Sequence, residues 1–239
     1  MSFVLPDPRI ADPKFQGDDN AAYSSSEWLD YIASMIRAAH ARGKRTIVLT
    51  TSFVDTEVLG KRIGDLKPLV HGRSTTLGQL LPQYKENPHA ILISPSAWEG
   101  VNLPGMVNEL VIPKIPFTSF DSAEYEIHKL ELTARGHDKD SVSRIIYGRL
   151  IVNTKRKLGQ GIGRGLRSKN DVCTLWLGDP RFPLPDSITK SLDDVVLDAP
   201  VRKINTSLVE VIPHRFKSSY EKAPIFNKDT NEIYQPLRL

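Results

Sequence analysis

Four short, largely apolar segments, separated by longer stretches of mixed polarity, constrain the fold of this chain most. They occupy residues 46–51, 90–94, 110–112 and 172–177. Each is short and rich in Val, Ile or Leu, which is typical of strands buried on both faces of a sheet. The stretches between them repeat apolar residues at helical spacing. Short strands alternating with amphipathic helices predict an α/β fold with a mainly parallel sheet covered on both faces.

Periodicity and turn residues predict three parts of the chain. Residues 1–23 contain several prolines, so we expect an extended lead-in rather than a folded element. Ser24 and Glu27 are spaced as a capping box and begin a helix that Gly43 ends. Residues 24–186 then form the α/β domain, with a helical insertion at 118–158. Residues 187–239 lose this regularity and form a C-terminal extension.

The most basic part of the chain contains a glycine-rich run. No Asp or Glu occurs between residues 141 and 170, and residues 160–167 read Q-G-I-G-R-G-L-R. Gly163 and Gly165 let the backbone around Arg164 approach an anion closely. If the segment is helical, Arg164 and Arg167 are neighbours on its surface and both can reach one polyphosphate. A solvated basic face beside a glycine turn is the alternative interpretation.

Composition excludes several kinds of protein. The only cysteine, Cys173, rules out an intrachain disulfide framework and a cysteine-rich metal site, and its apolar surroundings predict a buried structural thiol. The net charge of +4 is too small to indicate nucleic-acid binding by itself. The sequence contains no signal peptide and no long apolar stretch, so we expect a soluble, intracellular and cytoplasmic protein with no membrane partner.

Polar residues follow three of the predicted strands, at the edge where parallel α/β sheets bind ligands. Residues 50–53 read T-T-S-F, residues 98–105 read W-E-G-V-N-L-P-G, and residues 160–168 are followed after the next strand by D-P-R at 179–181. In this order the segments resemble motifs IV, V and VI, with the sequel of motif VI, in the second RecA-like domain of DinG/XPD helicases, a group of superfamily 2. The resemblance covers roughly residues 43–181 and implies a RecA-like three-layer domain.

The resemblance also implies roles for individual residues. ATP and Mg²⁺ would lie between this domain and a first RecA-like domain, and Arg164 and Arg167 would reach the γ-phosphate as arginine fingers. Gln160 would orient one of these arginines. The positions carried over for nucleotide binding and coupling are Glu99, Gly100, Asn102 and Gly163. The family usually has Asp where this chain has Asn102, so we expect altered nucleotide affinity or coupling.

Single-stranded DNA would cross the faces of both domains, held through its phosphates and by stacking on aromatic rings. The resemblance implies travel from 5′ to 3′. The expected contacts are Ser52, Phe53, Ser96, Trp98, Lys155, Arg156 and Lys157. Two alternatives remain open at this point: Trp98 is a core residue, and Glu99 is an ordinary surface carboxylate.

Two parts of a complete helicase are missing from the sequence. It contains no G-x-x-x-x-G-K-[ST] loop and no D-E-A-H-like acidic box, so it lacks the phosphate cradle and the Mg²⁺ ligands. We therefore expect half of a motor, inactive alone, whose other half is the first RecA-like domain.

A non-catalytic RecA-like module is the rival hypothesis. Such a module would bind nucleic acid and dock a recruiting protein or RNA–protein complex through the C-terminal extension, as in the CRISPR-associated branch of DinG proteins. The aromatic residues of the extension would then face that partner. If the extension packs on its own domain instead, the same aromatic residues are core: Phe216, Tyr220, Phe226 and Tyr234.

Overall fold

An eight-stranded sheet forms the centre of the molecule, as a computed structural model describes it for residues 1–10, 13, 24–117, 123–166, 171–190, 192 and 206–235. The strand order is β3-β4-β2-β5-β6-β1-β7-β8. Every pair is parallel except β7 with β8. The predicted α/β class with a mainly parallel sheet is confirmed. The strands are β1 (Ser2–Pro6), β2 (Thr46–Leu49), β3 (Leu69–Val70), β4 (Ile91–Ser94), β5 (Glu109–Ile112), β6 (Thr174–Leu177), β7 (Ile225–Phe226) and β8 (Ile233–Tyr234).

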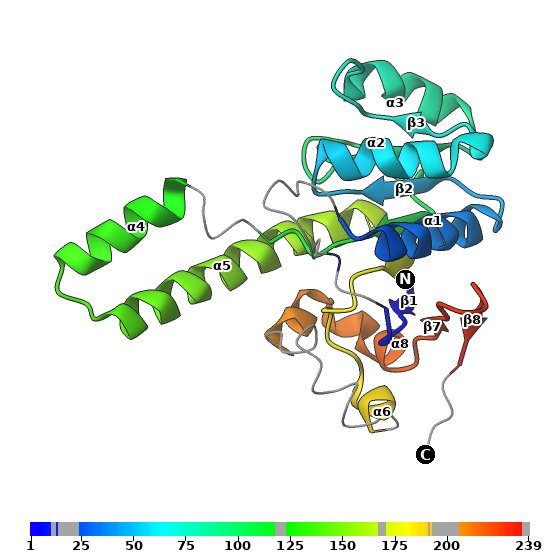
Figure 1. Ribbon diagram of the computed structural model, residues 1–239. Coiled ribbons are helices and arrows are strands. Elements are labelled where there is room, and N and C mark those ends of the chain that lie inside the picture. The colour runs from blue at the N-terminus through cyan, green and yellow to red at the C-terminus, as the bar shows by residue number, and fades with distance from the viewer. Residues whose placement is uncertain are drawn as a thin grey trace.

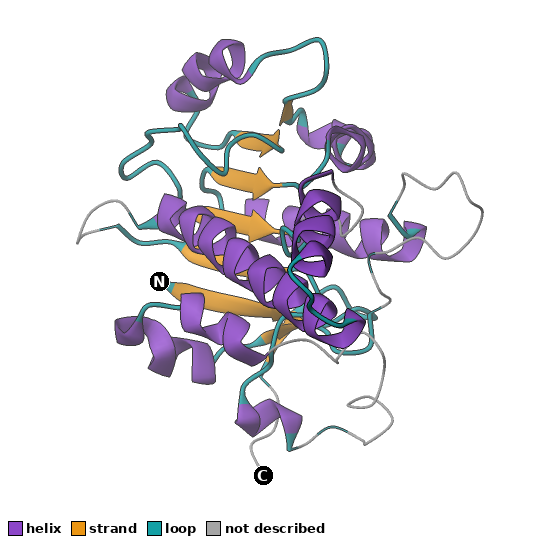
Figure 2. Ribbon diagram, turned by 90° about the vertical axis from the view of Figure 1, so that its left-hand side faces the viewer, coloured by secondary structure: helices purple, strands orange, loops and turns teal. Residues whose placement is uncertain are grey.

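Helices cover both faces of the sheet, which gives the three layers of a RecA-like domain (Figures 1 and 2). Successive residues of a strand point to opposite faces. In β5, Leu110 and Ile112 pack in the cluster that includes residues of α3 and α5, whereas Val111 packs with α1 and α2. The α-helices are α1 (Ser26–His40), α2 (Phe53–Arg62), α3 (Leu77–Glu86), α4 (Ala123–Ala134), α5 (Lys139–Ile162), α6 (Asp186–Thr189) and α8 (Lys217–Glu221).

The N-terminal segment corrects one prediction. Residues 1–23 were expected to lie outside the fold, but Ser2–Pro6 form β1, which pairs with β6 and β7 inside the sheet. Phe3, Val4 and Leu5 are almost fully buried. This apolar run has only three residues and is followed by prolines at positions 6, 8 and 13, so composition favoured a lead-in although three buried side chains specify a strand.

The C-terminal extension completes the sheet. Its strand β7 pairs with β1, and Tyr220 of α8 packs edge-on against Phe3 at a centroid distance of 5.9 Å. Phe226 lies under Tyr31 and Trp176. Tyr220 and Phe226 are buried, Phe216 is partly buried, and Tyr234 remains 37% exposed. The described part of the extension, residues 206–235, therefore packs on the sheet domain.

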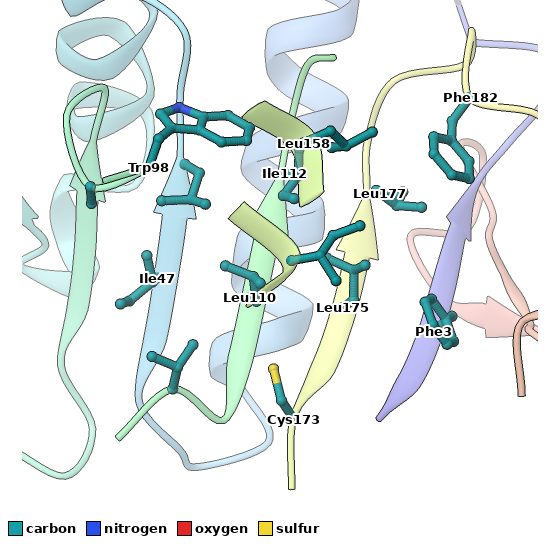
Figure 3. Packing of buried hydrophobic residues seen from close by; sticks show 14 of the residues in the cluster. Phe3, Ile47, Trp98, Leu110, Ile112, Leu158, Cys173, Leu175, Leu177 and Phe182 are labelled. Atoms are coloured by element: carbon teal, nitrogen blue, oxygen red, sulfur yellow. The ribbon is translucent and has the colours of Figure 1, made fainter. Parts of the chain in front are cut away.

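The helices α4 and α5 form a hairpin that projects away from the sheet (Figure 1). Its own small core joins the two helices through Tyr125, Leu132, Val142, Ile146, Leu150 and Ile151. Helix α5 continues beyond the predicted end of the insertion at residue 158 and returns to the sheet. Leu158 (Figure 3) and Ile162 enter the main core there. None of the described helices combines the length and apolar character needed to cross a membrane.

Candidate functional site

The carboxyl ends of the parallel strands bring the predicted motifs to one edge of the sheet. Strand β2 ends at Leu49 and is followed by the loop with Ser52, β4 ends at Ser94 before Ser96, and β5 ends at Ile112 before Lys114. Because β4, β2 and β5 are neighbours and run parallel, their following loops lie side by side. Parallel α/β sheets bind their ligands at this edge.

The loop after β2 presents one exposed aromatic ring. Ser52 caps α2, with its Oγ accepting a hydrogen bond from the Asp55 amide at 3.0 Å. Phe53 is 37% exposed and packs perpendicular to the His71 ring at a centroid distance of 5.5 Å. His71 Nδ1 lies 2.8 Å from Ser94 Oγ, and burial lowers the pKa of this imidazole. Sequence reasoning missed His71, which directly follows β3.

Trp98 is a core residue and its ring is unavailable for stacking on a base. It is 2% exposed, and its Nε1 donates a hydrogen bond to the carbonyl oxygen of Thr50 at 2.6 Å. The ring lies on Gly161 of α5, where an added Cβ would come within 2.5 Å of it. The expectation that Trp98 contacts DNA is therefore corrected in favour of the core alternative. Tryptophan fills this position because its indole joins β2, the loop after β4 and α5 (Figure 3).

The turn that follows Trp98 exposes three of the predicted coupling residues. Glu99, Gly100 and Asn102 are exposed, whereas the intervening Val101 is 4% exposed. Gly100 has a φ of 73°, a left-handed conformation that favours glycine. The buried Trp98 and Val101 thus anchor a turn whose polar groups face outward, beside the carboxyl edge.

Arg164 is already engaged within the protein. Its Nε and one terminal nitrogen donate to the carbonyl oxygen of Trp98 at 2.9 and 2.5 Å, and the other terminal nitrogen donates to that of Val101 at 2.5 Å. Gln160 is exposed on the last turn of α5, and Gly163 caps that helix. The second predicted finger, Arg167, lies outside the described residues.

Two of the three glycines in the motif VI segment allow close packing within the protein instead of leaving space for an anion. An added Cβ at Gly161 would collide with Trp98, and one at Gly165 would collide with Cys173, whereas Gly163 has nothing within 4 Å. The group that lies close to Gly165 is therefore the Cys173 side chain and not the predicted anion. Cys173 is buried as predicted, and burial raises the pKa of its thiol to about 12.

The three consecutive basic residues of α5 do not share one surface. Lys155 Nζ binds Glu210 Oε2 at 2.9 Å on the side of the C-terminal segment. Lys157 Nζ lies over the Trp98 ring, 5.8 Å from its centroid. Arg156 is exposed. Successive residues on a helix differ by about 100° in direction, so Arg156 is the member of this group best placed for an external anion.

Two strand ends carry the same clamp, in which a buried aspartate binds an arginine two residues later. In Asp179-Pro180-Arg181, the Asp179 carboxylate accepts hydrogen bonds from the amide of Ile115 and from the Arg181 guanidinium. Asp7 does the same after β1, where it binds Arg9 and the amide of Lys228. Each aspartate therefore ties its own strand end to the end of the neighbouring strand. Among the described residues, no three His, Cys, Asp or Glu side chains gather as a metal site.

Comparisons with known proteins agree with this architecture. The solved structure "XPD_APO" aligns with a TM-score of 0.50 at 18% identity, covering 74% of this chain and 35% of that one. "XPD_Helicase" gives 0.49 at 17% identity with shares of 74% and 31%, and the Xpd4 protein of S. tokodaii gives 0.45 at 19% identity with shares of 64% and 30%. The chain thus spans about a third of each of these structures.

At 18% identity, the likeness to "XPD_APO" supports the RecA-like fold alone. No curated protein sequence matches this chain. Residues 35–195, two thirds of the chain, match the helicase C-terminal domain family. The matched residues contain the loops at the carboxyl edge, the helical hairpin and the segment from Gln160 to Arg181. The chain therefore belongs to the family of helicase C-terminal domains.

Proposed function

We propose that this chain is the C-terminal motor half of an ATP-dependent DNA helicase and acts together with a first RecA-like domain. The main support is the arrangement around Trp98, which we call the Trp98 junction: Thr50, Trp98, Val101, Gly161 and Arg164. It joins the segments predicted as motifs IV, V and VI at one edge of the sheet. The Trp98 junction suits a domain in which changes at a bound nucleotide must be transmitted to a bound nucleic acid.

In this proposal ATP binds between the two RecA-like domains. The other domain supplies the phosphate loop and the Mg²⁺ ligands, and no metal ligand is assigned to this chain. Arg167 supplies positive charge to the γ-phosphate as its charge develops in the transition state, and the exposed Gln160 orients it or senses the nucleotide. Glu99, Gly100, Asn102 and Gly163 line the side of the domain that approaches the nucleotide.

The DNA track is assigned to the exposed groups beside these loops. Phe53 offers a ring face for base stacking, and Ser96 and Arg156 offer polar contacts to phosphates. Ser52 contributes less through its hydroxyl, which already caps α2, and Lys155 and Lys157 have protein partners. The 5′ to 3′ direction is inherited from the resemblance to DinG/XPD helicases.

The test compares the chain alone with the chain joined to a first RecA-like domain. The isolated chain should give no ATP turnover above background, whereas the joined protein should hydrolyse ATP in the presence of single-stranded DNA. In the joined protein, Arg167→Ala should lower kcat by about 10³-fold or more and change the KM for ATP much less, because a finger acts mainly in the transition state. Arg144→Ala, which removes a charge from the distant part of α5, is the control. Turnover by the isolated chain, or unchanged kcat in Arg167→Ala, contradicts the proposal.

A further inference from the structure

We infer that Arg164 is a positioning residue, which sets the conformation of the turn at residues 98–101 instead of contacting the reacting phosphate. The inference concerns the site of the proposed function and rests on that proposal only for its DNA-binding consequence. Its basis is the set of three hydrogen bonds from one guanidinium group to the carbonyl oxygens of Trp98 and Val101.

The geometry of these bonds places the guanidinium inside the turn. The two acceptors are three residues apart, and the segment between them contains the exposed Glu99 and the left-handed Gly100. A planar fork with several donors can hold two carbonyls at a fixed separation, whereas a lysine ammonium is a point charge on a flexible stem. Arg164 therefore fixes both ends of the segment that carries Glu99 and Gly100.

Arg164 itself is held in place by the packing of α5. The Trp98 ring lies on Gly161, and the Trp98 indole nitrogen donates to Thr50 at the end of β2. Arg164 follows Gly161 by one short turn at the end of α5. A displacement of α5 thus moves both Gly161, on which the Trp98 ring lies, and the Arg164 guanidinium. The conformation of the turn at the carboxyl edge therefore depends on the position of α5.

A finger would have to give up these contacts before reaching a phosphate on another domain. The guanidinium is half-buried, and both carbonyl groups would lose a charged donor. Hydrogen bonds to charged groups are among the stronger ones in proteins. The contacts of Arg164 thus favour a role in positioning the turn at residues 98–101. Contact with the γ-phosphate is assigned to Arg167.

The first test follows hydrogen exchange by NMR in the whole 239-residue chain. The probe is the buried indole N–H of Trp98, which binds the carbonyl oxygen of Thr50. In Arg164→Ala this N–H should exchange about tenfold faster or more, because opening of the turn becomes less costly. Arg164→Lys keeps the charge but loses the fork, so it should exchange like Arg164→Ala. Arg156→Ala, on α5, should leave the exchange of this N–H unchanged. Normal protection in Arg164→Lys, or faster exchange spread evenly over the sheet, overturns the inference.

The second test measures single-stranded DNA affinity of the same variants as a function of salt. Arg164→Ala should lower the affinity several-fold and leave the slope of log K against log[salt] unchanged, because no phosphate contact is lost. Arg156→Ala, a proposed direct contact, should reduce the slope by about 0.7. An equal reduction in Arg164→Ala means that Arg164 touches phosphate, which overturns the inference. If the wild-type chain binds no DNA while the exchange pattern is as expected, the proposed DNA track fails and the positioning role of Arg164 stands.

Discussion

At the scale of single residues, the site depends on a contact between an aromatic ring and a glycine. Trp98 is part of the motif V segment and Gly161 of the motif VI segment, and the absence of a side chain at Gly161 lets the indole lie directly on α5. Leu49, the last residue of β2, approaches the same point. Three separate segments therefore meet at one position that tolerates no additional atom.

Gly161→Ala should consequently destabilise the protein and disturb the site, although alanine is the better helix former. An added Cβ would lie 2.5 Å from Trp98 and 3.2 Å from Leu49. Overpacking of this kind costs about 1–3 kcal/mol, more than the gain in helix propensity of about 1 kcal/mol. Urea denaturation measures the change, with Gly148→Ala on the same helix as control, because nothing lies within 4 Å of its Cβ position. Gly148→Ala should be neutral or stabilising, and an equal loss in both variants contradicts the packing argument.

The sequence indicates which segments carry the candidate site residues, but it does not reveal how these residues are arranged. The spacing of glycines and arginines indicated an anion site, yet the sequence does not reveal that Arg164 binds carbonyl groups of its own chain. The burial of Trp98 could be stated only as an alternative, because a tryptophan beside a strand end suits both packing and stacking. The tertiary position of α5 decides between the two, and no local pattern encodes it.

At the scale of elements, α5 has two functions along its length. Its first half packs against α4 in the hairpin core, and its last residues enter the main core beside Trp98. Its polar face was predicted as one basic cluster, but Lys155, Arg156 and Lys157 point in different directions and meet different partners. Charge counted along a sequence therefore overestimates the charge that one face of a helix presents.

The ends of β1 and β6 are held by the repeated D-P-R clamp. Asp7 is buried, and although burial raises its pKa, hydrogen bonds and charge from Arg9 and the amide of Lys228 lower the pKa overall. A lowered pKa in the folded state means that Asp7 contributes stability above its unfolded pKa of about 3.9 and loses it as the pH falls through the folded value.

Asp7→Asn should therefore lower the free energy of unfolding at pH 7 by about 1–3 kcal/mol, because the donors of Arg9 and Lys228 lose their charged acceptor at this buried position. The difference between wild type and variant should shrink as the pH falls below about 4. Chemical denaturation at pH 7, 5 and 3.5 measures it, with Asp229→Asn as control, since that carboxylate is exposed and binds Arg9 from outside. A difference that stays constant over this range rules out the contribution of the Asp7 charge.

At the scale of the whole molecule, the two ends of the chain complete one sheet. The sequence predicted β2, β4, β5 and β6, but it missed the five-residue strand β1 and the two-residue strands β7 and β8. Prolines follow the apolar residues of β1, and β7 and β8 are too short to give a local signal. The pairing of β1 with β6 and β7 is set by contacts between residues far apart in the sequence. The same pairing removes much of the support for a freely available adaptor segment, since the described residues 206–235 cover the sheet edge and part of one face.

This arrangement predicts that the C-terminal segment is needed for folding. Phe226 is fully buried against Trp176 and Tyr31, and its carbonyl oxygen accepts the Tyr31 hydroxyl at 3.0 Å. Phe226→Ala should lower the free energy of unfolding by about 3–5 kcal/mol, as for other buried aromatic residues. Tyr234→Ala, at a side chain 37% exposed, should change it by at most about 0.5 kcal/mol. Both variants are compared by thermal and urea denaturation, and deletion of residues 206–239 should give a chain that no longer unfolds cooperatively. If the deleted chain keeps the wild-type melting temperature and Phe226→Ala is neutral, the segment is not part of the core, and an adaptor role regains its basis.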